Sequence, residues 1–275
     1  MGAQKGGEIR VGIGGWTYAP WRGLFFPADL PKRAELEYAS RTVTSIEVNG
    51  TFYRTQTPAT YRRWHDETPD DFLFSLKAPR YATHRRVLAE AGPSVKRFLE
   101  SGLLELKKKL GPINWQFPPS LRYDAEDFGA FLELLPPEFN GHPLRHAVEV
   151  RHDTFNSAEF IGQLRHYGIA AVFTDKEAVP NLRDLTARFV YLRLHRSAAE
   201  HPTGYPAADL DAWVARALRW SRGDEPDDMT TVAARKPPRA STRDVYIYAI
   251  NGFKPHAPAA ARAMLDRLQA SMRGT

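Results

Sequence analysis

The chain has 275 residues, of which 43% are hydrophobic and 25% charged, a composition typical of a globular protein with a full apolar core. Its 38 lysines and arginines against 32 acidic residues give a net charge of +6, which suits anionic small molecules or nucleic acid as partners. It has no cysteine, which excludes disulfides, a thiolate nucleophile and cysteine-ligated metals.

The chain carries no signal for a membrane or for export. No apolar run is long enough to span a bilayer, and residues 1–8 lack the apolar core of a signal peptide. We therefore expect a cytoplasmic protein without membrane contact. Nothing in the sequence indicates an oligomeric state.

Short apolar segments alternate with amphipathic ones along the chain. The short segments predict strands at residues 9–14, 45–49, 72–77, 113–117, 146–151, 169–173, 189–195 and 245–250. Helical spacing of apolar residues predicts helices near 31–40, 58–65, 95–110, 124–135, 160–167, 210–218 and 261–268. Thr57 is expected to cap the helix near 58–65, and Asp124 the helix near 124–135. Gly111-Pro112 is expected to end the helix near 95–110.

Eight strands alternating with helices predict an α/β fold, the parallel eight-stranded TIM (β/α)8 barrel, as a single domain over residues 1–275. A doubly wound open sheet is the alternative. The run Gly12-Ile13-Gly14-Gly15-Trp16 lacks the third glycine of a dinucleotide fingerprint, which favours the barrel.

One segment, at about 221–243, does not fit the alternation. It has acidic and basic proline-rich runs and almost no large apolar residues. We expect a polar surface loop or insertion that does not pack on the barrel.

Polar side chains gather at the carboxyl ends of the predicted strands, where TIM barrels carry their active sites. Strand alternation pairs Glu47 with Asn49, Glu149 with Arg151 and Arg193 with His195 on the inner face. The same alternation turns Val48, Val150 and Leu194 toward the helices.

The candidate catalytic residues are Glu47, Lys77, Glu149, Asp175 and His195. The carboxylates could act as acid and base, or hold a divalent metal with His195, or simply pair with neighbouring cations. Because Lys77, Arg80, Arg151 and Arg193 are expected at the same rim, they would repel a metal ion. We therefore predict no metal and no cofactor.

The candidate substrate-binding residues are cationic, aromatic and amide side chains. Arg80, Arg151 and Arg193 would hold an anion through bidentate contacts. The aromatic residues would stack on a ring, or else plug one end of the barrel. The full set is Trp16, Tyr18, Trp21, Asn49, Tyr53, Arg80, Gln116, Arg151, Arg193 and Asn251.

Several short motifs at these strand ends occur together. They are Gly14-Gly15-Trp16-Thr17-Tyr18, Glu47-Val48-Asn49-Gly50-Thr51-Phe52-Tyr53, Lys77-Ala78-Pro79-Arg80, Gln116-Phe117-Pro118-Pro119, Glu149-Val150-Arg151-His152 and Tyr191-Leu192-Arg193-Leu194-His195. In this combination the chain resembles the YecE-like proteins, a family of unknown function (domain of unknown function 72). The resemblance implies a TIM barrel and no established reaction. The chain departs from the family pattern at Arg196, where glycine is usual, and at Asn251-Gly252, where paired asparagines are usual.

Two functions fit these observations. The first is an enzyme of the hydrolase, lyase or isomerase type that acts at the rim on an anionic, ring-containing substrate, for which a phosphorylated compound is one option. The second is a nucleic-acid-associated binding module without catalysis, for which only weak binding is expected. Cations confined to a cleft would favour the enzyme, whereas a broad basic surface would favour the binding module.

Overall fold

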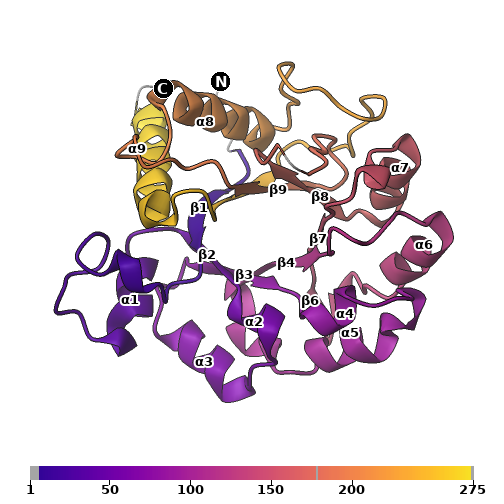
Figure 1. The fold of residues 1–275 in the computed structure, drawn as a ribbon, viewed down its shortest axis with the longest axis horizontal. Helices are drawn as coiled ribbons and strands as arrows, with labels where there is room; N and C mark the ends of the chain where they lie inside the picture. Colours follow the sequence, from indigo (N-terminus) through magenta and orange to yellow (C-terminus); the bar gives the residue numbers. More distant parts are fainter. Residues whose placement is uncertain (1–5, 178, 274–275) are drawn as a thin grey trace.

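The computed structural model, which describes residues 6–177 and 179–273, contains a closed barrel of parallel strands ringed by helices (Figure 1). Around the barrel the strands follow the order β1-β10-β9-β8-β7-β4-β3-β2. They are β1 (Ile9–Gly14), β2 (Ser45–Val48), β3 (Leu73–Lys77), β4 (Leu110–Gln116), β7 (His146–Glu149), β8 (Ala170–Thr174), β9 (Phe189–Leu194) and β10 (Asp244–Ala249). The predicted TIM (β/α)8 barrel is therefore confirmed.

The strands divide their side chains between two apolar clusters, as the alternation along each strand requires. The larger cluster lies between strands and helices and includes Val48, Val150 and Leu194. The smaller one holds the alternate side chains of the later strands, among them Tyr191 and Tyr248. The outward direction expected for the three apolar residues is confirmed.

The helices range from 4 residues in α2 to 17 in α9, and several begin with a cap that the sequence shows. They are α1 (Glu35–Ser40), α2 (Gly50–Tyr53), α3 (Pro58–Asp66), α4 (Arg80–Thr83), α5 (Gly92–Leu99), α6 (Ala125–Glu133), α7 (Ala158–Tyr167), α8 (Ala207–Ser221) and α9 (Ala257–Arg273). The 3-10 turns span Ala19–Trp21, Lys32–Ala34, Ala89–Ala91, Leu103–Lys109, Asp153–Phe155 and Lys254–His256. The Thr57 and Asp124 side chains accept hydrogen bonds from backbone amides in the first turns of α3 and α6, which confirms both predicted caps.

The helix predicted over 95–110 is wrong in its second half. The α-helix ends at Leu99, and Gly102 takes a left-handed backbone with φ 97°. A 3-10 turn follows, and Gly111-Pro112 lie inside β4 rather than after a helix. The spacing of buried Leu103 and Leu106 imitates a helix, but the backbone turns at the glycine between them and α5.

A small antiparallel hairpin, β5 (Glu138–Phe139) with β6 (His142–Pro143), precedes β7 and was not predicted. Asn140 and Gly141 both have positive φ, at 48° and 79°, as a tight hairpin turn requires. The two strands are too short to give a sequence signal.

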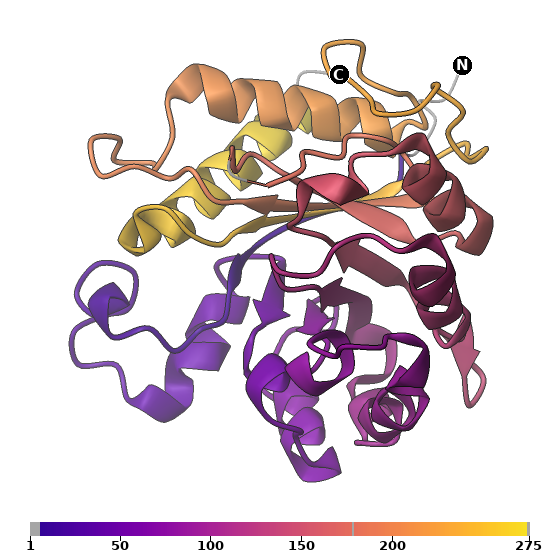
Figure 2. The same cartoon turned by 45° about the vertical axis from the view of Figure 1, so that its right-hand side comes forward.

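The segment between α8 and β10 is irregular, as predicted (Figure 2). It nevertheless packs against the rest of the chain. Met229 is 4% exposed and belongs to the main core. The backbone amides of Val232 and Ala233 donate to the buried Asp184 carboxylate, at 2.8 and 3.0 Å. The expectation that this segment does not pack is wrong, because one apolar side chain and two backbone donors suffice to anchor a mostly polar loop.

Candidate functional site

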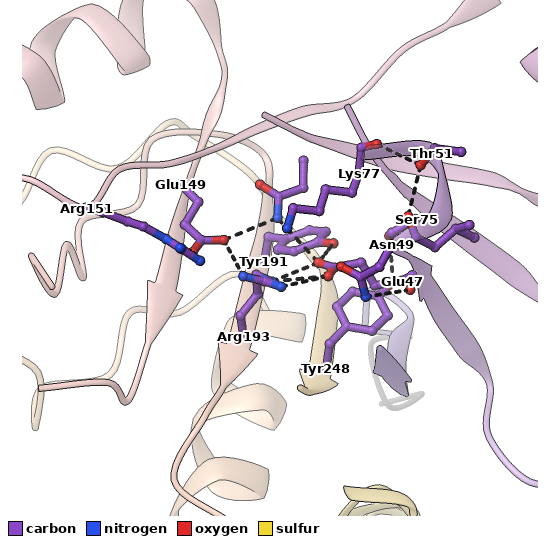
Figure 3. A network of polar contacts seen from close by, with 12 residues as sticks. Glu47, Asn49, Thr51, Ser75, Lys77, Glu149, Arg151, Tyr191, Arg193 and Tyr248 are labelled. Carbon is purple, nitrogen blue, oxygen red and sulfur yellow. Dashed lines mark hydrogen bonds and ion pairs between the residues drawn. The ribbon is translucent and has the colours of Figure 1, made fainter. Parts of the chain in front are cut away.

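The carboxyl ends of four strands bring charged side chains from distant parts of the sequence into one network (Figure 3). Glu47 comes from β2, Lys77 from β3, Glu149 from β7 and Arg193 from β9. All four side chains are buried, with exposed fractions from 0 to 7%. Each lies at the end of its strand, which is why the closed barrel makes them converge.

Arg193 is the centre of this network. Its Nη2 lies 2.9 Å from Glu47 Oε1 and its Nε 3.0 Å from Glu47 Oε2. Its Nη1 donates to Glu149 Oε2 at 2.5 Å. One guanidinium therefore holds two carboxylates, and the desolvation cost of three buried charges is offset by mutual attraction and hydrogen bonds.

Glu149 has a second cationic partner in Arg151, whose Nη2 lies 2.9 Å from Glu149 Oε1. Burial by itself would raise the pKa of Glu149, but the Arg193 and Arg151 guanidinium groups outweigh it and lower this pKa to about 2. Glu149 therefore stays ionised at neutral pH.

Glu47 is fully buried beneath the cavity floor and is held from several sides. Tyr191 donates its hydroxyl to Glu47 Oε2 at 2.7 Å, and Asn114 Nδ2 lies 3.3 Å from the same oxygen. Burial and the nearby Glu47 charge raise the pKa of Tyr191 well above its usual range, so it remains a neutral donor. Below, the Tyr248 hydroxyl bonds both Ser45 and Ser75, at 2.7 and 2.6 Å.

Lys77 differs from the other charges because its ammonium has no hydrogen bond or ion pair within the described residues. It lies 4.1 Å from the centre of the Phe52 ring. Burial, helped by repulsion from Arg193, lowers the pKa of Lys77 to about 8. The Lys77 ammonium is therefore mostly charged at neutral pH but loses its proton at a lower pH than an ordinary lysine does.

Lys77, Arg151 and Arg193 line an open cavity of about 1000 Å³. Seven cationic side chains line it: Arg54, Arg63, Lys77, Arg80, Arg151, Arg193 and Lys254. The described residues that line the cavity include no aspartate or glutamate. The wall is therefore positive overall, although Glu47 and Glu149 lie behind it and balance the charges of Arg193 and Arg151.

The structure places most of the predicted site residues in this wall. They are Trp16, Asn49, Tyr53, Lys77, Arg80, Gln116, Arg151, Arg193, His195 and Asn251. Glu47 and Glu149 lie in the supporting network instead. Tyr18 and Trp21 pack edge to face against each other at 5.4 Å, and the Trp21 indole donates to the Lys254 backbone carbonyl at 3.0 Å, so both support the wall from outside the cavity.

Asp175 is not brought to the network. Its carboxylate accepts the backbone amide of His195 at 2.6 Å and the Tyr205 hydroxyl at 2.7 Å. Burial raises its pKa, although these hydrogen bonds counteract the change. Asp175 thereby holds the chain after β9, which positions the neighbouring His195.

His195 itself lines the cavity. Burial and the adjacent Arg193 charge lower its pKa to about 4. Its imidazole is therefore neutral at pH 7, is a weaker base than an ordinary histidine, and can donate or accept a hydrogen bond through its two ring nitrogens.

The sequence reasoning missed Arg54, Arg63 and Lys254 as wall residues. Arg54 directly follows the aromatic run after β2, so its position was a usable signal. Arg63 lies on the cavity side of α3, and Lys254 begins a 3-10 turn after β10. No local pattern separates these two from ordinary surface cations, because only the packing of α3 and the last loop places them at the cavity.

Among residues 6–177 and 179–273, no group of three or more histidine, aspartate or glutamate side chains is arranged to hold a metal ion. In the same part of the chain, no helix is long and apolar enough to cross a membrane.

The family model for the protein of unknown function DUF72 matches residues 10–275. The chain belongs to the DUF72 family. The sequence resemblance to YecE-like proteins is thereby confirmed.

Similar proteins agree with this membership. The UPF0759 protein YecE of Escherichia coli strain K12 is 30% identical over 150 residues, which are 54% of this chain and 50% of that protein. The YecE protein of Escherichia coli O157:H7 matches equally, so the chain spans about half the length of the curated relatives it matches.

Solved structures of the family share the fold. A DUF72 family protein of Thermotoga maritima superimposes with a TM-score of 0.69 and 21% identity, over 97% of this chain and 99% of that one. A DUF72 family protein of Enterococcus faecalis gives 0.69 and 17%, over 95% of each chain. At these identities the likeness establishes the barrel alone.

Proposed function

We propose that this DUF72 protein is an enzyme of the hydrolase, lyase or isomerase type that binds a small anionic, ring-containing substrate in the cavity. The observation that carries the proposal is the charge of the wall, with seven cations and no carboxylate among its described residues. Like charges around one cavity repel each other, and an anionic ligand would relieve that repulsion.

The wall offers more than charge. Arginine can contact a phosphate or carboxylate with two parallel hydrogen bonds, and Arg80 and Arg151 both line the cavity. Trp16 lines it as well and is held edge to face by Trp64, with ring centres 5.3 Å apart, so it can serve as a rigid surface for a ring.

Lys77 and His195 are the groups we assign to proton movement. Both line the cavity, and the Lys77 pKa of about 8 lies close to neutral pH, as a proton carrier requires. We assign Glu47 and Glu149 to positioning, because both are held by Arg193, and the Glu149 pKa of about 2 keeps it ionised and a weak base at neutral pH.

Ligand-induced stabilisation tests the proposal. Sugar phosphates, nucleoside monophosphates and inorganic phosphate should raise the melting temperature, while the matching neutral sugars and nucleosides should not. At a concentration one hundred times Kd, a ligand adds about 2.7 kcal/mol of stability. In a protein of this size that corresponds to a rise of roughly 5–10 °C.

Two neighbouring arginines on α3 provide a matched control. Arg63 lines the cavity and its Nε lies 3.7 Å from Glu67 Oε1. Arg62 pairs with Glu105 elsewhere on the surface, with 3.1 Å between Nη2 and Oε1. Arg63→Ala should weaken anion binding about tenfold, as the loss of one charged hydrogen-bonding contact does, and Arg62→Ala should not. Equal stabilisation by neutral and anionic compounds, or equal losses in both variants, would contradict the proposal.

A further inference from the structure

We propose that Lys77 is an amine nucleophile that forms an imine with the carbonyl carbon of an anionic aldehyde or ketone bound in the cavity. This inference rests on the proposed function, because the cationic wall must first hold the ligand's anionic group. It narrows the substrate class to carbonyl compounds that carry a phosphate or carboxylate.

The network around Lys77 leaves it as the one charge without a counter-ion. Glu47 and Glu149 are both bound by Arg193, and Glu149 is also bound by Arg151. Two carboxylates thus balance two guanidinium groups, which do not lose their protons in proteins. Lys77 is the remaining cation, so it is the group in this cluster that can become neutral when the cluster is desolvated.

A second buried lysine shows what a structural lysine looks like in this protein. Lys109 is 1% exposed, and its Nζ donates to the carbonyls of His65 and Thr68, at 2.5 and 2.7 Å. Lys77 is 7% exposed and has no such acceptor in the described part of the chain. The chain therefore surrounds the buried ammonium that serves stability with backbone acceptors, and leaves the one at the cavity open to solvent or a ligand.

The position of Lys77 is fixed from three sides. Thr51 donates its hydroxyl to the Lys77 carbonyl at 2.7 Å, and Phe52 packs its ring under the amine. The next residue, Ala78, donates its amide to the Asn114 carbonyl at 2.9 Å. The backbone of Lys77 is thus held at two points, and its amine lies over the Phe52 ring. These contacts restrict where the amine can meet a bound carbonyl.

The reaction balances without any other reagent. The lone pair on Lys77 Nζ attacks the carbonyl carbon, a C–N bond forms, and one proton moves from nitrogen to oxygen to give a carbinolamine. Loss of water then breaks the C–O bond and leaves a C=N bond. Amine and carbonyl together yield imine and water, with no oxidation or reduction. Neutral His195 and the donor–acceptor groups of the wall are available for the proton transfer.

Reductive trapping with pyridoxal 5′-phosphate tests the inference. This aldehyde carries a ring and a phosphate, and borohydride converts its imines into stable secondary amines. Trapping adds the mass of the probe less one oxygen to the modified peptide. We expect Lys77 to be labelled at least about tenfold faster than exposed Lys96, because each pKa unit changes the neutral fraction about tenfold.

Three controls make the result specific. Lys254 lines the same cavity and burial lowers its pKa as well, so it gives the labelling that proximity and partial burial produce together. Lys77→Arg keeps the charge but removes the primary amine, so the dominant adduct should disappear. The aldehyde 5′-deoxypyridoxal has no phosphate, and it should label Lys77 at least about tenfold more slowly if the cationic wall binds the anion.

The outcomes separate this inference from the proposed function. Labelling of Lys77 no faster than that of Lys254 or Lys96, together with stabilisation by phosphate compounds, would overturn the nucleophile and leave the anion site standing. Equal labelling of Lys77 by both aldehydes would overturn the anion site. Fast, phosphate-dependent labelling of Lys77 that is lost in Lys77→Arg would support both.

Discussion

Arg193 on β9 binds the carboxylate of Glu47 on β2 through both Nε and Nη2, although two other strands, β10 and β1, separate β9 from β2 around the barrel. The pair therefore spans the lumen and ties opposite parts of the wall together. It also places a guanidinium under the cavity while withdrawing a carboxylate from it. This arrangement explains why the cavity is positive even though acidic residues lie close by.

Glu47→Gln should lower the free energy of unfolding by about 3 kcal/mol or more, because it leaves the buried Arg193 without its bidentate partner. Denaturant unfolding measures the change. Glu37→Gln is the matched control, since Glu37 pairs with Arg41 on the surface and should contribute less than about 1 kcal/mol. A loss for Glu47→Gln as small as that of the control would show that the network does not brace the barrel.

Lys77→Met should stabilise the protein at pH 7 by up to about 3 kcal/mol. The folded-state pKa is about 8 against an ordinary 10.5, and each pKa unit corresponds to about 1.4 kcal/mol. Below pH 8 the wild-type lysine is charged in both states, so the full cost of burying the charge is present. The cost fades as pH rises from 8 to 10.5, and the gain from the substitution should fade with it.

Lys109→Met is the contrasting variant. Burial lowers the pKa of Lys109 as well, but its ammonium donates to two backbone carbonyls. The loss of these hydrogen bonds should destabilise the protein by about 1–3 kcal/mol. If both methionine variants changed the unfolding free energy in the same direction, the distinction between the two buried lysines would fail.

Acid should destabilise the fold between pH 6.5 and about 4 through His146. Its Nδ1 accepts from the Trp115 indole and its Nε2 donates to the Pro136 carbonyl, at 3.0 and 2.8 Å. Burial lowers its pKa to about 4, so the unfolded chain binds the proton first as pH falls. The stability that neutral His146 contributes is complete above pH 6.5, and it decreases by up to about 3 kcal/mol as pH falls to 4.

Unfolding measured from pH 7 to 4 should show this slope, and His146→Gln should reduce it. Part of the slope should remain, because His195 also has a pKa lowered to about 4 and acts with the same sign. His142→Asn, at an exposed position of the hairpin, should leave the slope unchanged. An unchanged slope in His146→Gln would contradict the assignment.

Replacement of residues 224–238 with a short Gly/Ser linker should cost several kcal/mol. It exposes the site of Met229, worth about 1.5–3 kcal/mol, and leaves the Asp184 carboxylate without two donors, worth about 1–3 kcal/mol. Thermal unfolding measures the effect. Lys236→Ser, at an exposed position of the same loop, should be neutral. A wild-type melting temperature after the replacement would restore the view that the loop does not pack.

Nucleic acid should bind only weakly and without sequence preference. Binding through many phosphate contacts falls steeply with salt, so retardation of duplex DNA or RNA in gels should disappear by about 0.2 M salt. Tight binding that persists at this salt concentration would instead favour the nucleic-acid module over the enzyme.

The sequence by itself determined the barrel and the positions of its polar strand ends. Period-two alternation is a local property, and it correctly turned Val150 and Leu194 outward. Caps are local as well, which is why Thr57 and Asp124 could be identified in advance. The prediction that one helix runs over 95–110 and ends at Gly111-Pro112 was wrong. The spacing of apolar residues is the same in a continuous α-helix and in a helix interrupted at Gly102.

Only the tertiary structure decided which charges face the ligand and which face each other. Glu47 and Lys77 have similar signals in the sequence, yet one is paired beneath the cavity and the other is unpaired in its wall. Asp175 ends a strand like the others but bonds the His195 amide instead. The physical reason is that ion pairing and desolvation depend on distances between strands, and closure of the barrel sets those distances, not the order of residues along any one strand.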